Sequence, residues 1–326
     1  MTTWTCRRAA LLALCWAAAF AATDGGAQAY PARVVRYVIP GGAGAGTDII
    51  GRIIASGLTQ VFHQQVIVDN RPGAGGNIGP ELAAKAPPDG YTILQISITH
   101  AVNVSLYRSL RYDIVRDFNA VTQLASAPAI IVIHPSLPAR SVADLVKLAK
   151  ARPGVINYAS AGTGTPTFLA AELFKAMAGI DLVHVPYKGG AEAQTSTIAG
   201  ETSVYFASFA TALPFVRQGR LRALAVTSAK RVPQLPEYPT VAESGYRDYQ
   251  AGNWYGLLVP ARTPKETIAA IRTATVAVLG NAGVQRQLSD QGYITVGDQP
   301  EEFAAFIRAE IATLAKVIRS LALSAD

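Results

Sequence analysis

Residues 40–48 read Pro-Gly-Gly-Ala-Gly-Ala-Gly-Thr-Asp. An apolar run at 34–39 precedes this stretch, and a helical pattern at 49–62 follows it. Glycine lets the loop backbone approach a ligand closely, and the first amides of a helix have no acceptor within the helix. The helix dipole adds partial positive charge at the same place. The stretch therefore predicts a strand, a loop and a helix whose N-terminus can bind an anion.

A second stretch has the same design. Residues 160–166 read Ser-Ala-Gly-Thr-Gly-Thr-Pro, after an apolar run at 155–159 and before a helical pattern at 167–178. For each loop taken alone, a tight strand–helix turn without a ligand is an equally good interpretation as an anion site. Two such loops in one chain favour a single carboxylate or phosphate ligand that is held from both sides.

Short apolar runs alternate with helical patterns along nearly the whole chain, which is typical of α/β folds. Runs that are apolar on both faces favour parallel strands covered by helices. Thr263-Pro264 with Glu266 predicts a capping box, with proline as the first residue of the helix. The expected strands are 34–39, 65–69, 92–98, 129–134, 155–159, 182–185, 203–206, 221–227 and 254–259.

The length of the chain predicts two lobes, each a mostly parallel sheet flanked by helices. The segments 119–129 and 249–257 are the expected crossings between them. One lobe is expected to hold residues 30–127 and 253–326, and the other residues 128–252. Each lobe then carries one glycine loop, at the carboxyl ends of strands where ligands of open sheets bind.

The N-terminus has the pattern of a secretory signal peptide. Arg7 and Arg8 precede an apolar stretch at 9–22, and Ala27-Gln28-Ala29 is a cleavage pattern. We predict that residues 1–29 are removed by cleavage after Ala29 and that the mature chain is exported to the periplasm.

Composition excludes several classes of function. Both cysteines, Cys6 and Cys15, lie in the predicted signal peptide, so the mature chain has no disulfide, thiolate nucleophile or cysteine-bound zinc. The formal net charge is +7, but Lys and Arg are scattered singly, without the clustered patch that nucleic acid binding needs. A mild positive field that favours small anions is the better interpretation.

Common catalytic motifs do not occur in the chain. Thr47 stands where the third glycine of a dinucleotide-binding G-x-G-x-x-G motif belongs. There is no P-loop and no G-x-S-x-G nucleophile elbow, and the four histidines show no metal-ligand spacing. We therefore expect no cofactor, no metal and no enzymatic activity. An exported enzyme that acts on a carboxylic acid stays as an alternative.

Ligand contacts are expected from the two loops and from hydroxyl groups that follow strands. Asp48 is also expected to accept backbone N–H bonds at its helix start. The candidate ligand-binding residues are Gly44, Ala45, Gly46, Thr47, Asp48, Ser97, Thr99, Ser160, Gly162, Thr163, Gly164, Thr165 and Ser208.

Several further motifs resemble those of the Bug family, the periplasmic solute receptors of tripartite tricarboxylate transporters. The resemblance covers nearly all of the mature chain. It rests on Asp-Asn-Arg-Pro-Gly-Ala-Gly-Gly-Asn-Ile-Gly at 69–79, Pro-Asp-Gly-Tyr-Thr at 88–92, His-Val-Pro-Tyr-Lys-Gly at 184–189, Leu-Arg-Ala-Leu-Ala-Val-Thr at 221–227 and Pro-Thr-Val-Ala-Glu-Ser-Gly at 239–245.

The resemblance implies a two-lobed periplasmic binding protein that closes on a small carboxylate held by backbone amides and ordered waters. It places the contacts at residues 44–48 and 160–165. The implied partners are the integral-membrane permease subunits of the transporter, and the receptor is expected to be a monomer. A sensory adaptor, whose loaded form docks to a signalling protein, is a further alternative.

The chain departs from the family pattern at three positions. Ala43 and Ala45 replace the usual residues of the first loop, and Phe168 stands where a histidine is common after the second. Phe168 is expected to pack against the protein, unless it faces the cleft and favours an apolar or aromatic acid. The identity of the carboxylate therefore stays open among dicarboxylates, tricarboxylates, amino acids and aromatic acids.

Overall fold

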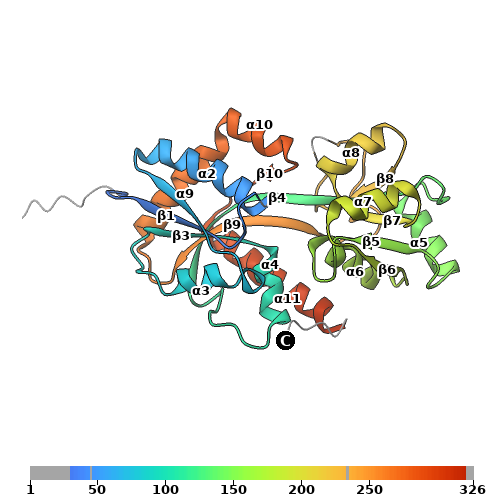
Figure 1. The fold of residues 1–326 in the computed structure, drawn as a ribbon, viewed down its shortest axis with the longest axis horizontal. Coiled ribbons are helices and arrows are strands. Elements are labelled where there is room, and N and C mark those ends of the chain that lie inside the picture. Colours follow the sequence, from blue (N-terminus) through green and yellow to red (C-terminus); the bar gives the residue numbers. More distant parts are fainter. Residues whose placement is uncertain (1–29, 45, 233–234, 321–326) are drawn as a thin grey trace, which may run out of the picture.

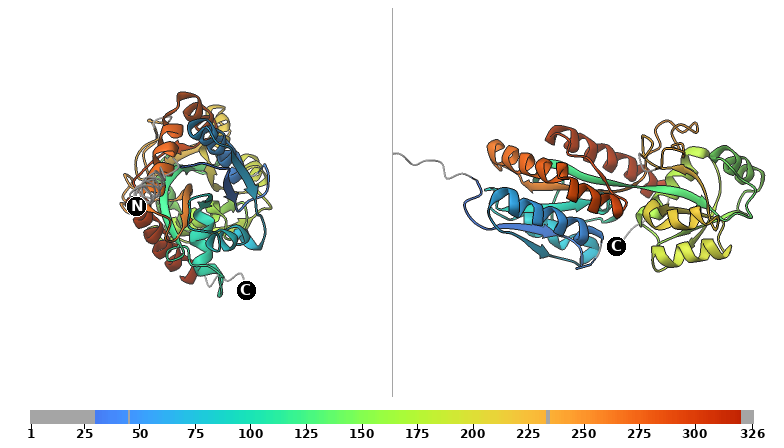
Figure 2. Two further views of the ribbon diagram at one scale, coloured as in Figure 1. Left: turned by 90° about the vertical axis from the view of Figure 1, so that its left-hand side faces the viewer. Right: turned by 90° about the horizontal axis from the view of Figure 1, so that it is seen from above.

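The computed structural model describes residues 30–44, 46–232 and 235–320. The predicted signal peptide with its two cysteines, and the candidate residue Ala45, lie outside the described residues. The described chain forms two halves along its longest axis, and two long strands run from one half into the other (Figures 1 and 2).

The first half is built on a mixed sheet. β1 (Val35–Ile39) lies between β2 (Val66–Asn70) and β3 (Thr92–Ser97), and both pairings are parallel. β9 (Gly252–Pro260) pairs with β3 antiparallel, and β4 (Phe118–Ile133) pairs with β9 antiparallel.

The second half repeats this arrangement on the far end of β4. There β4 pairs antiparallel with β7 (Val204–Ser208) and with β8 (Arg222–Val226). β5 (Asn157–Ser160) is parallel to both β7 and β6 (Val183–Pro186). The α/β class is as predicted. The expected parallel pairing holds for β2-β1-β3 and β6-β5-β7, whereas β4 and its partners pair antiparallel.

β4 is much longer than the predicted strand at 129–134, because residues 118–128 also belong to it. The polar residues Thr122, Gln123 and Ser126 interrupt the apolar pattern there, and Pro128 is a poor strand former. The backbone partners of this segment come from distant strands and are not visible in the local pattern. β9 pairs along it, and β10 (Ile294–Thr295) pairs with Ala125 and Ser126.

Helices cover both faces of the first sheet. α2 (Gly46–Phe62), α9 (Lys265–Gly280) and α10 (Ala282–Asp290) pack together above it in the view of Figure 1. α3 (Ile78–Ala84), α4 (Ile98–Leu106) and α11 (Pro300–Ser320) lie below it. The second half carries α5 (Val142–Ala151), α6 (Pro166–Ala178), α7 (Gly190–Ala199) and α8 (Phe209–Arg217).

One core cluster runs through both halves. It contains Phe168 of α6, Trp254 of β9 and Phe303 of α11, all of them buried. α11 also contacts α6 directly. The two halves are therefore joined by packed side chains as well as by two strands.

Helix ends follow the sequence signals in part. Thr165 accepts a bond from Phe168 N at the start of α6, and Gly179 ends the helix in the left-handed conformation. The capping box predicted for α9 was wrong. The helix begins at Lys265, and the Thr263 hydroxyl donates to Pro260 O instead, because the chain is still turning out of β9 there.

No single helix among the described residues is long and apolar enough to cross a membrane. α9 and α10 meet that test only together, by length and composition, and they are bent by 73° at their junction.

Candidate ligand-binding site

The strand directions place each glycine loop at the end of its sheet that faces the other half of the molecule. β1 and β3 run in the same direction as β4, toward the second half, because β9 is antiparallel to both β3 and β4. β7 and β5 run against β4, toward the first half. The loop after β1 and the loop after β5 therefore each project toward the opposite half, and α2 and α6 begin beside them.

Asp48 is the centre of the first loop. Its side chain is buried, with 3% of the residue exposed. Oδ2 accepts bonds from Gly44 N and from Arg52 Nε, both at 2.8 Å, and Oδ1 accepts one from Asn70 Nδ2 at 2.9 Å. The Asn70 amide also donates to Gly41 O at 3.0 Å. Asp48 therefore holds the loop closed. Its backbone donor is Gly44, a loop residue that precedes α2, and not one of the first helix amides that were expected.

Electrostatics at Asp48 agree with this role. Burial acts to raise the pKa of the carboxyl, but the bonds from Arg52, Gly44 and Asn70 outweigh burial and lower it below the ordinary value. Asp48 is therefore a carboxylate throughout the neutral range, and both of its oxygens are occupied by donors of the protein itself.

Two further hydrogen bonds hold backbone carbonyl groups of the loop. Gln95 Nε2 donates to Thr47 O at 2.7 Å, and the buried Tyr37 hydroxyl orients the Gln95 amide through a 2.8 Å bond. Tyr293 OH donates to Gly46 O at 3.3 Å. Gly44 has a φ of +80°, which L-residues rarely adopt, and both Gly44 and Gly46 are exposed. The loop thus presents mainly backbone to solvent.

The second loop is held by a buried serine. Ser160 Oγ accepts a bond from Gly162 N at 3.0 Å and contacts His184 Nε2 at 2.7 Å. Thr165 Oγ1 donates to Gly162 O at 2.6 Å. Gly162 and Gly164 have φ values of +118° and +79°, and the side chain of Thr163 is exposed. This loop also presents backbone and one hydroxyl.

His184 anchors that serine from the next strand. Its ring stacks on Tyr158 at a centroid distance of 5.0 Å and contacts Phe168 at 4.7 Å. Burial lowers the pKa of His184, so the neutral ring is favoured. Phe168 is only 5% exposed, so it packs beneath the second loop, as expected for this departure from the family pattern.

The hydroxyl candidates divide into exposed and buried groups. Two candidates are exposed, namely Thr99 in the first turn of α4 and Ser208 at the end of β7. Ser97 is buried, and its backbone N–H donates to His100 Nδ1 at 3.0 Å. Burial lowers the pKa of His100 to about 4, against the bond with Ser97, so this ring is neutral. Ser160 therefore shapes the second loop from inside, whereas Ser97 fixes the first turn of α4.

The residues that hold the loops were not predicted from the sequence. Asn70, Gln95 and His184 come from neighbouring strands, and none of them was a candidate. Asn70 and His184 do lie in the motifs at 69–79 and 184–189, whose residue types were the available signal. Within the described residues, no group of three or more His, Cys, Asp or Glu side chains is arranged to hold a metal ion.

Ser160→Ala tests the support of the second loop. The change leaves Gly162 N and His184 without this partner, and an unsatisfied buried donor costs about 1–3 kcal/mol. We expect a several-fold loss of ligand affinity by isothermal titration calorimetry, with the circular dichroism spectrum unchanged. Ser136→Ala is the matched control, because Ser136 forms an exposed 2.7 Å bond with His134 elsewhere in the same half. Equal affinity in both variants would contradict the role of Ser160.

Residues 50–323 match the model of the tripartite tricarboxylate transporter family receptors, TctC. The chain belongs to this receptor family. A UPF0065 protein of Pseudomonas sp. (strain P51) is 36% identical over 92% of this chain and 89% of its own length. Protein BugT of Bordetella pertussis is 33% identical over 90% of each chain. The TctC family consists of solute receptors, so the expectation of a receptor and not an enzyme is confirmed.

Solved structures of family members have the same fold. A TctC solute-binding protein from Polaromonas, without ligand, is 28% identical, covers 89% of this chain and 99% of its own, and has a TM-score of 0.81. R. palustris Rpa4515 with adipate is 34% identical, with a TM-score of 0.72 and coverages of 90% and 99%. MatC from Rhodopseudomonas palustris with bound malate is 27% identical, with a TM-score of 0.69 and coverages of 89% and 100%.

Proposed function

We propose that this receptor captures a small carboxylate between its two halves. The observation that carries the proposal is the pair of facing loops, each rich in exposed backbone and each beside a helix N-terminus. Backbone amides, directly or through waters, would hold the carboxylate oxygens. Adipate and malate, bound in two similar receptors, support a carboxylate as the ligand class.

Fewer residues are proposed to contact the ligand than the sequence suggested as candidates. Asp48 and Ser160 are engaged in buried bonds that hold the loops, and the buried Ser97 caps the start of α4, so none of the three is proposed to donate to the ligand. The remaining described candidates are Gly44, Gly46, Thr47, Thr99, Gly162, Thr163, Gly164, Thr165 and Ser208. Five of them are exposed, and Thr47, Gly162, Gly164 and Thr165 are half-buried. The dipoles of α2 and α6 each add about 0.3–1 kcal/mol.

Ligand capture would be accompanied by closure of two lobes. We assign residues 30–127 and 253–320 to one lobe and residues 128–252 to the other. β4 and β9 run from one to the other, so bending of these strands would bring the loops together. Closure is stabilised because the ligand then contacts both lobes.

The closed receptor would deliver its ligand to the membrane permease of a tripartite transporter. The receptor family to which the chain belongs supports this partner and a periplasmic site of action. Cleavage after Ala29 rests on the N-terminal sequence pattern alone. The motif at the N-terminus supports export.

A thermal-shift screen of the exported protein against mono-, di- and tricarboxylates and aromatic acids tests this function. A carboxylate present at about one hundred times its Kd should add about 2.7 kcal/mol to the free energy of unfolding. We expect a rise in Tm with at least one acid and no rise with its methyl ester or amide. A screen in which no acid raises Tm, or a ligand that is chemically converted, would contradict the proposal.

A further inference from the structure

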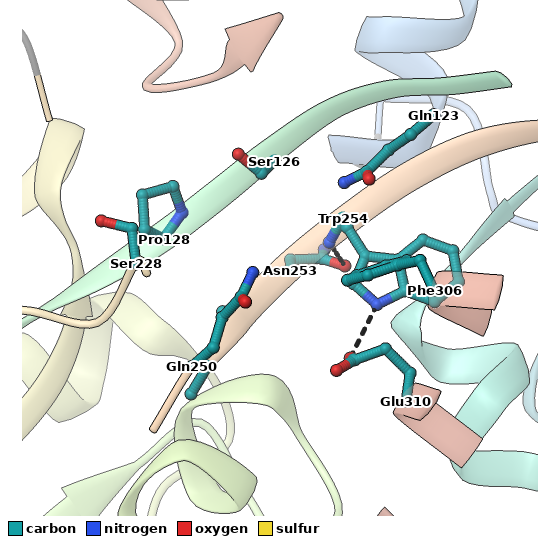
Figure 3. Close-up of a pocket in the computed structure, with 11 residues that line it drawn as sticks. Gln123, Ser126, Pro128, Ser228, Gln250, Asn253, Trp254, Phe306 and Glu310 are labelled. Carbon is teal, nitrogen blue, oxygen red and sulfur yellow. Dashed lines mark hydrogen bonds between the residues drawn. The ribbon is translucent and has the colours of Figure 1, made fainter. Parts of the chain in front are cut away.

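A small polar cavity lies beside the two crossing strands, β4 and β9 (Figure 3). Its volume is about 40 Å³, which leaves room for a few water molecules only. The indole N–H of Trp254 donates to Glu310 Oε2 at 3.0 Å there, and the Trp254 ring packs edge-on against Phe303 and Phe306. These contacts fix α11 against β9 within the first half. α11 is thereby held in place as one wall of a larger groove.

The larger groove lies at the edge of the first sheet. Its volume is about 670 Å³, which is typical of a binding site. α9 and α11 form its walls, and Asn119 and Ala120 of β4 form its floor. The two helices cover opposite faces of the sheet (Figure 1), so the groove between them follows the sheet edge. It lies at the end of β4 where Phe118 pairs with Pro260, away from the second half.

The floor of the groove is an edge strand. On one side, β4 pairs with β9 over residues 118–128. On the other side, β10 pairs with Ala125 and Ser126, and Asp298 Oδ1 accepts the Gln123 N–H at 2.7 Å. Among the described residues, no strand pairs with residues 118–122 on that side. Alternate residues of an edge strand present unpaired backbone groups, so this floor can pair with another extended chain.

Positive charge lines the groove on the α9 side. One face of α9 is turned into the groove, with residues at three- and four-residue spacing, namely Lys265, Ile268, Ala269 and Arg272. Arg262, in the turn before α9, adds a third cation. Within the described part of the chain, neither Arg262 nor Lys265 forms an ion pair. The Arg272 guanidinium donates to two backbone carbonyl groups, so its charge also lacks a carboxylate partner.

The α11 wall has a different character. It contributes the apolar residues Pro300 and Ala304 and one exposed acid, Glu301. Side chains of a strand point alternately to the two faces of its sheet. A chain paired with β4 would therefore direct every second side chain toward the cations of α9 and the others toward α11. Acidic residues that alternate with apolar ones match these two walls.

Arg262 has a strained backbone conformation. Its φ is +71°, a region that L-residues other than Asn and Asp rarely adopt, and glycine would form the same turn without this strain. Its side chain is exposed, so packing of the fold does not account for an arginine here. Strain of this kind clusters at functional sites. It supports a role for the Arg262 side chain in the groove.

We propose that the groove between α9 and α11 docks an extended segment of a partner protein in which acidic and apolar residues alternate. The backbone of the segment pairs with residues 118–122 of β4. Its acidic side chains face Arg262, Lys265 and Arg272, and its apolar side chains face α11. All residues of the groove belong to the first half, so docking requires neither the carboxylate ligand nor lobe closure.

A synthetic peptide tests the proposal. The probe is a fluorescein-labelled peptide of alternating Glu and Val, titrated with the exported protein at neutral pH and followed by fluorescence anisotropy. We expect saturable binding that weakens as salt is raised, because salt screens the attraction between exposed charges. The same peptide with methylated backbone nitrogens keeps its charges but has no N–H groups to pair with β4. It should bind at least tenfold more weakly.

Three variants of the protein make the test specific. Lys265→Glu should weaken binding at least tenfold, and the fold should tolerate it because an acid in the first turn of a helix interacts favourably with the dipole. Arg262→Gly should weaken binding several-fold while Tm stays the same or rises, since glycine relieves the left-handed conformation. Arg286→Glu, at an exposed cation of α10 outside the groove, is the control and should leave the affinity unchanged.

Each outcome decides the proposal. Absence of binding by the Glu-Val peptide overturns it. Equal binding of the methylated peptide would show a charged patch without strand pairing, and equal binding by Lys265→Glu would place the peptide outside the groove, so either result also overturns it. A fall in Tm of Arg262→Gly would show that this arginine serves the fold instead. These measurements need no carboxylate, so they stand even if the thermal-shift screen finds no ligand.

Discussion

Asp48→Ala is expected to lower the affinity for the carboxylate at least tenfold, which corresponds to about 1.4 kcal/mol. Three donors lose their acceptor in this variant, namely Gly44 N, Arg52 Nε and Asn70 Nδ2. Gly44 then no longer keeps its left-handed conformation, and the exposed amides of the loop lose their common direction. Isothermal titration calorimetry with the best acid from the screen measures the loss.

Asp48→Asn is the sharper form of the same experiment. Asparagine has the same shape, but its NH₂ group would face a donor, because protein donors occupy both oxygens of Asp48. We expect it to bind almost as weakly as Asp48→Ala. Glu81→Ala is the control, since Glu81 forms an i,i+4 ion pair with Lys85 on another helix. Unchanged affinity in Asp48→Asn would show that the loop does not depend on this carboxylate.

The stability of the Asp48 variants should also depend on pH. Because the pKa of Asp48 is lowered in the folded protein, its bonds stabilise the fold above the ordinary aspartate pKa of 3.8. This contribution is lost as the pH falls from that value through the lowered one. The difference in unfolding free energy between the wild type and Asp48→Ala should therefore shrink on acidification, within that window.

Gly256→Ala is expected to destabilise the protein more than any surface substitution. A Cβ atom at this position of β9 would lie 2.0 Å from Phe303 Cζ, and Phe303 of α11 is fully buried. Such overpacking costs typically about 1–3 kcal/mol and occasionally more. Thermal and urea unfolding measure the loss, with an unchanged m-value indicating that the native state alone is affected.

Two further variants identify the clash as the cause. Gly280→Ala introduces the same methyl group at the end of α9, where no atom lies within 4 Å, so Tm should stay the same or rise. Phe303→Leu removes the atoms that the new Cβ would meet. The cost of Gly256→Ala should therefore be smaller in the Phe303→Leu background than in the wild type. Strictly additive costs would show that α11 is not the obstacle.

Elements with a strong local signal could be predicted from the sequence. Pro166 after Thr165 and the αL glycine Gly179 mark the two ends of α6, and the structure agrees with both. The first half of β4 could not be predicted, since its polar residues pair with strands that lie more than a hundred residues away. The α9 cap failed for a similar reason, because Thr263 is still engaged with the end of β9.

The two candidate loops could be predicted from local residue types. The directions of their side chains could not. Ser160 was expected to reach the ligand, and it points into the protein toward His184. Asn70 and Gln95 hold the first loop from 22 and 48 positions further along the chain. No spacing rule connects residues so far apart, because their proximity depends on the strand order of the sheet.

The sequence by itself determined the α/β class, the two glycine loops and membership of the receptor family. These properties depend on backbone preferences and on residue types within a few positions of each other. Only the tertiary structure decided which polar groups hold the loops, why Gly256 must lack a side chain, and that Glu310 meets Trp254 beside the crossing strands. Those contacts join segments up to 247 residues apart, as between Tyr293 and Gly46. They exist because pairing and packing of distant strands and helices bring these groups together.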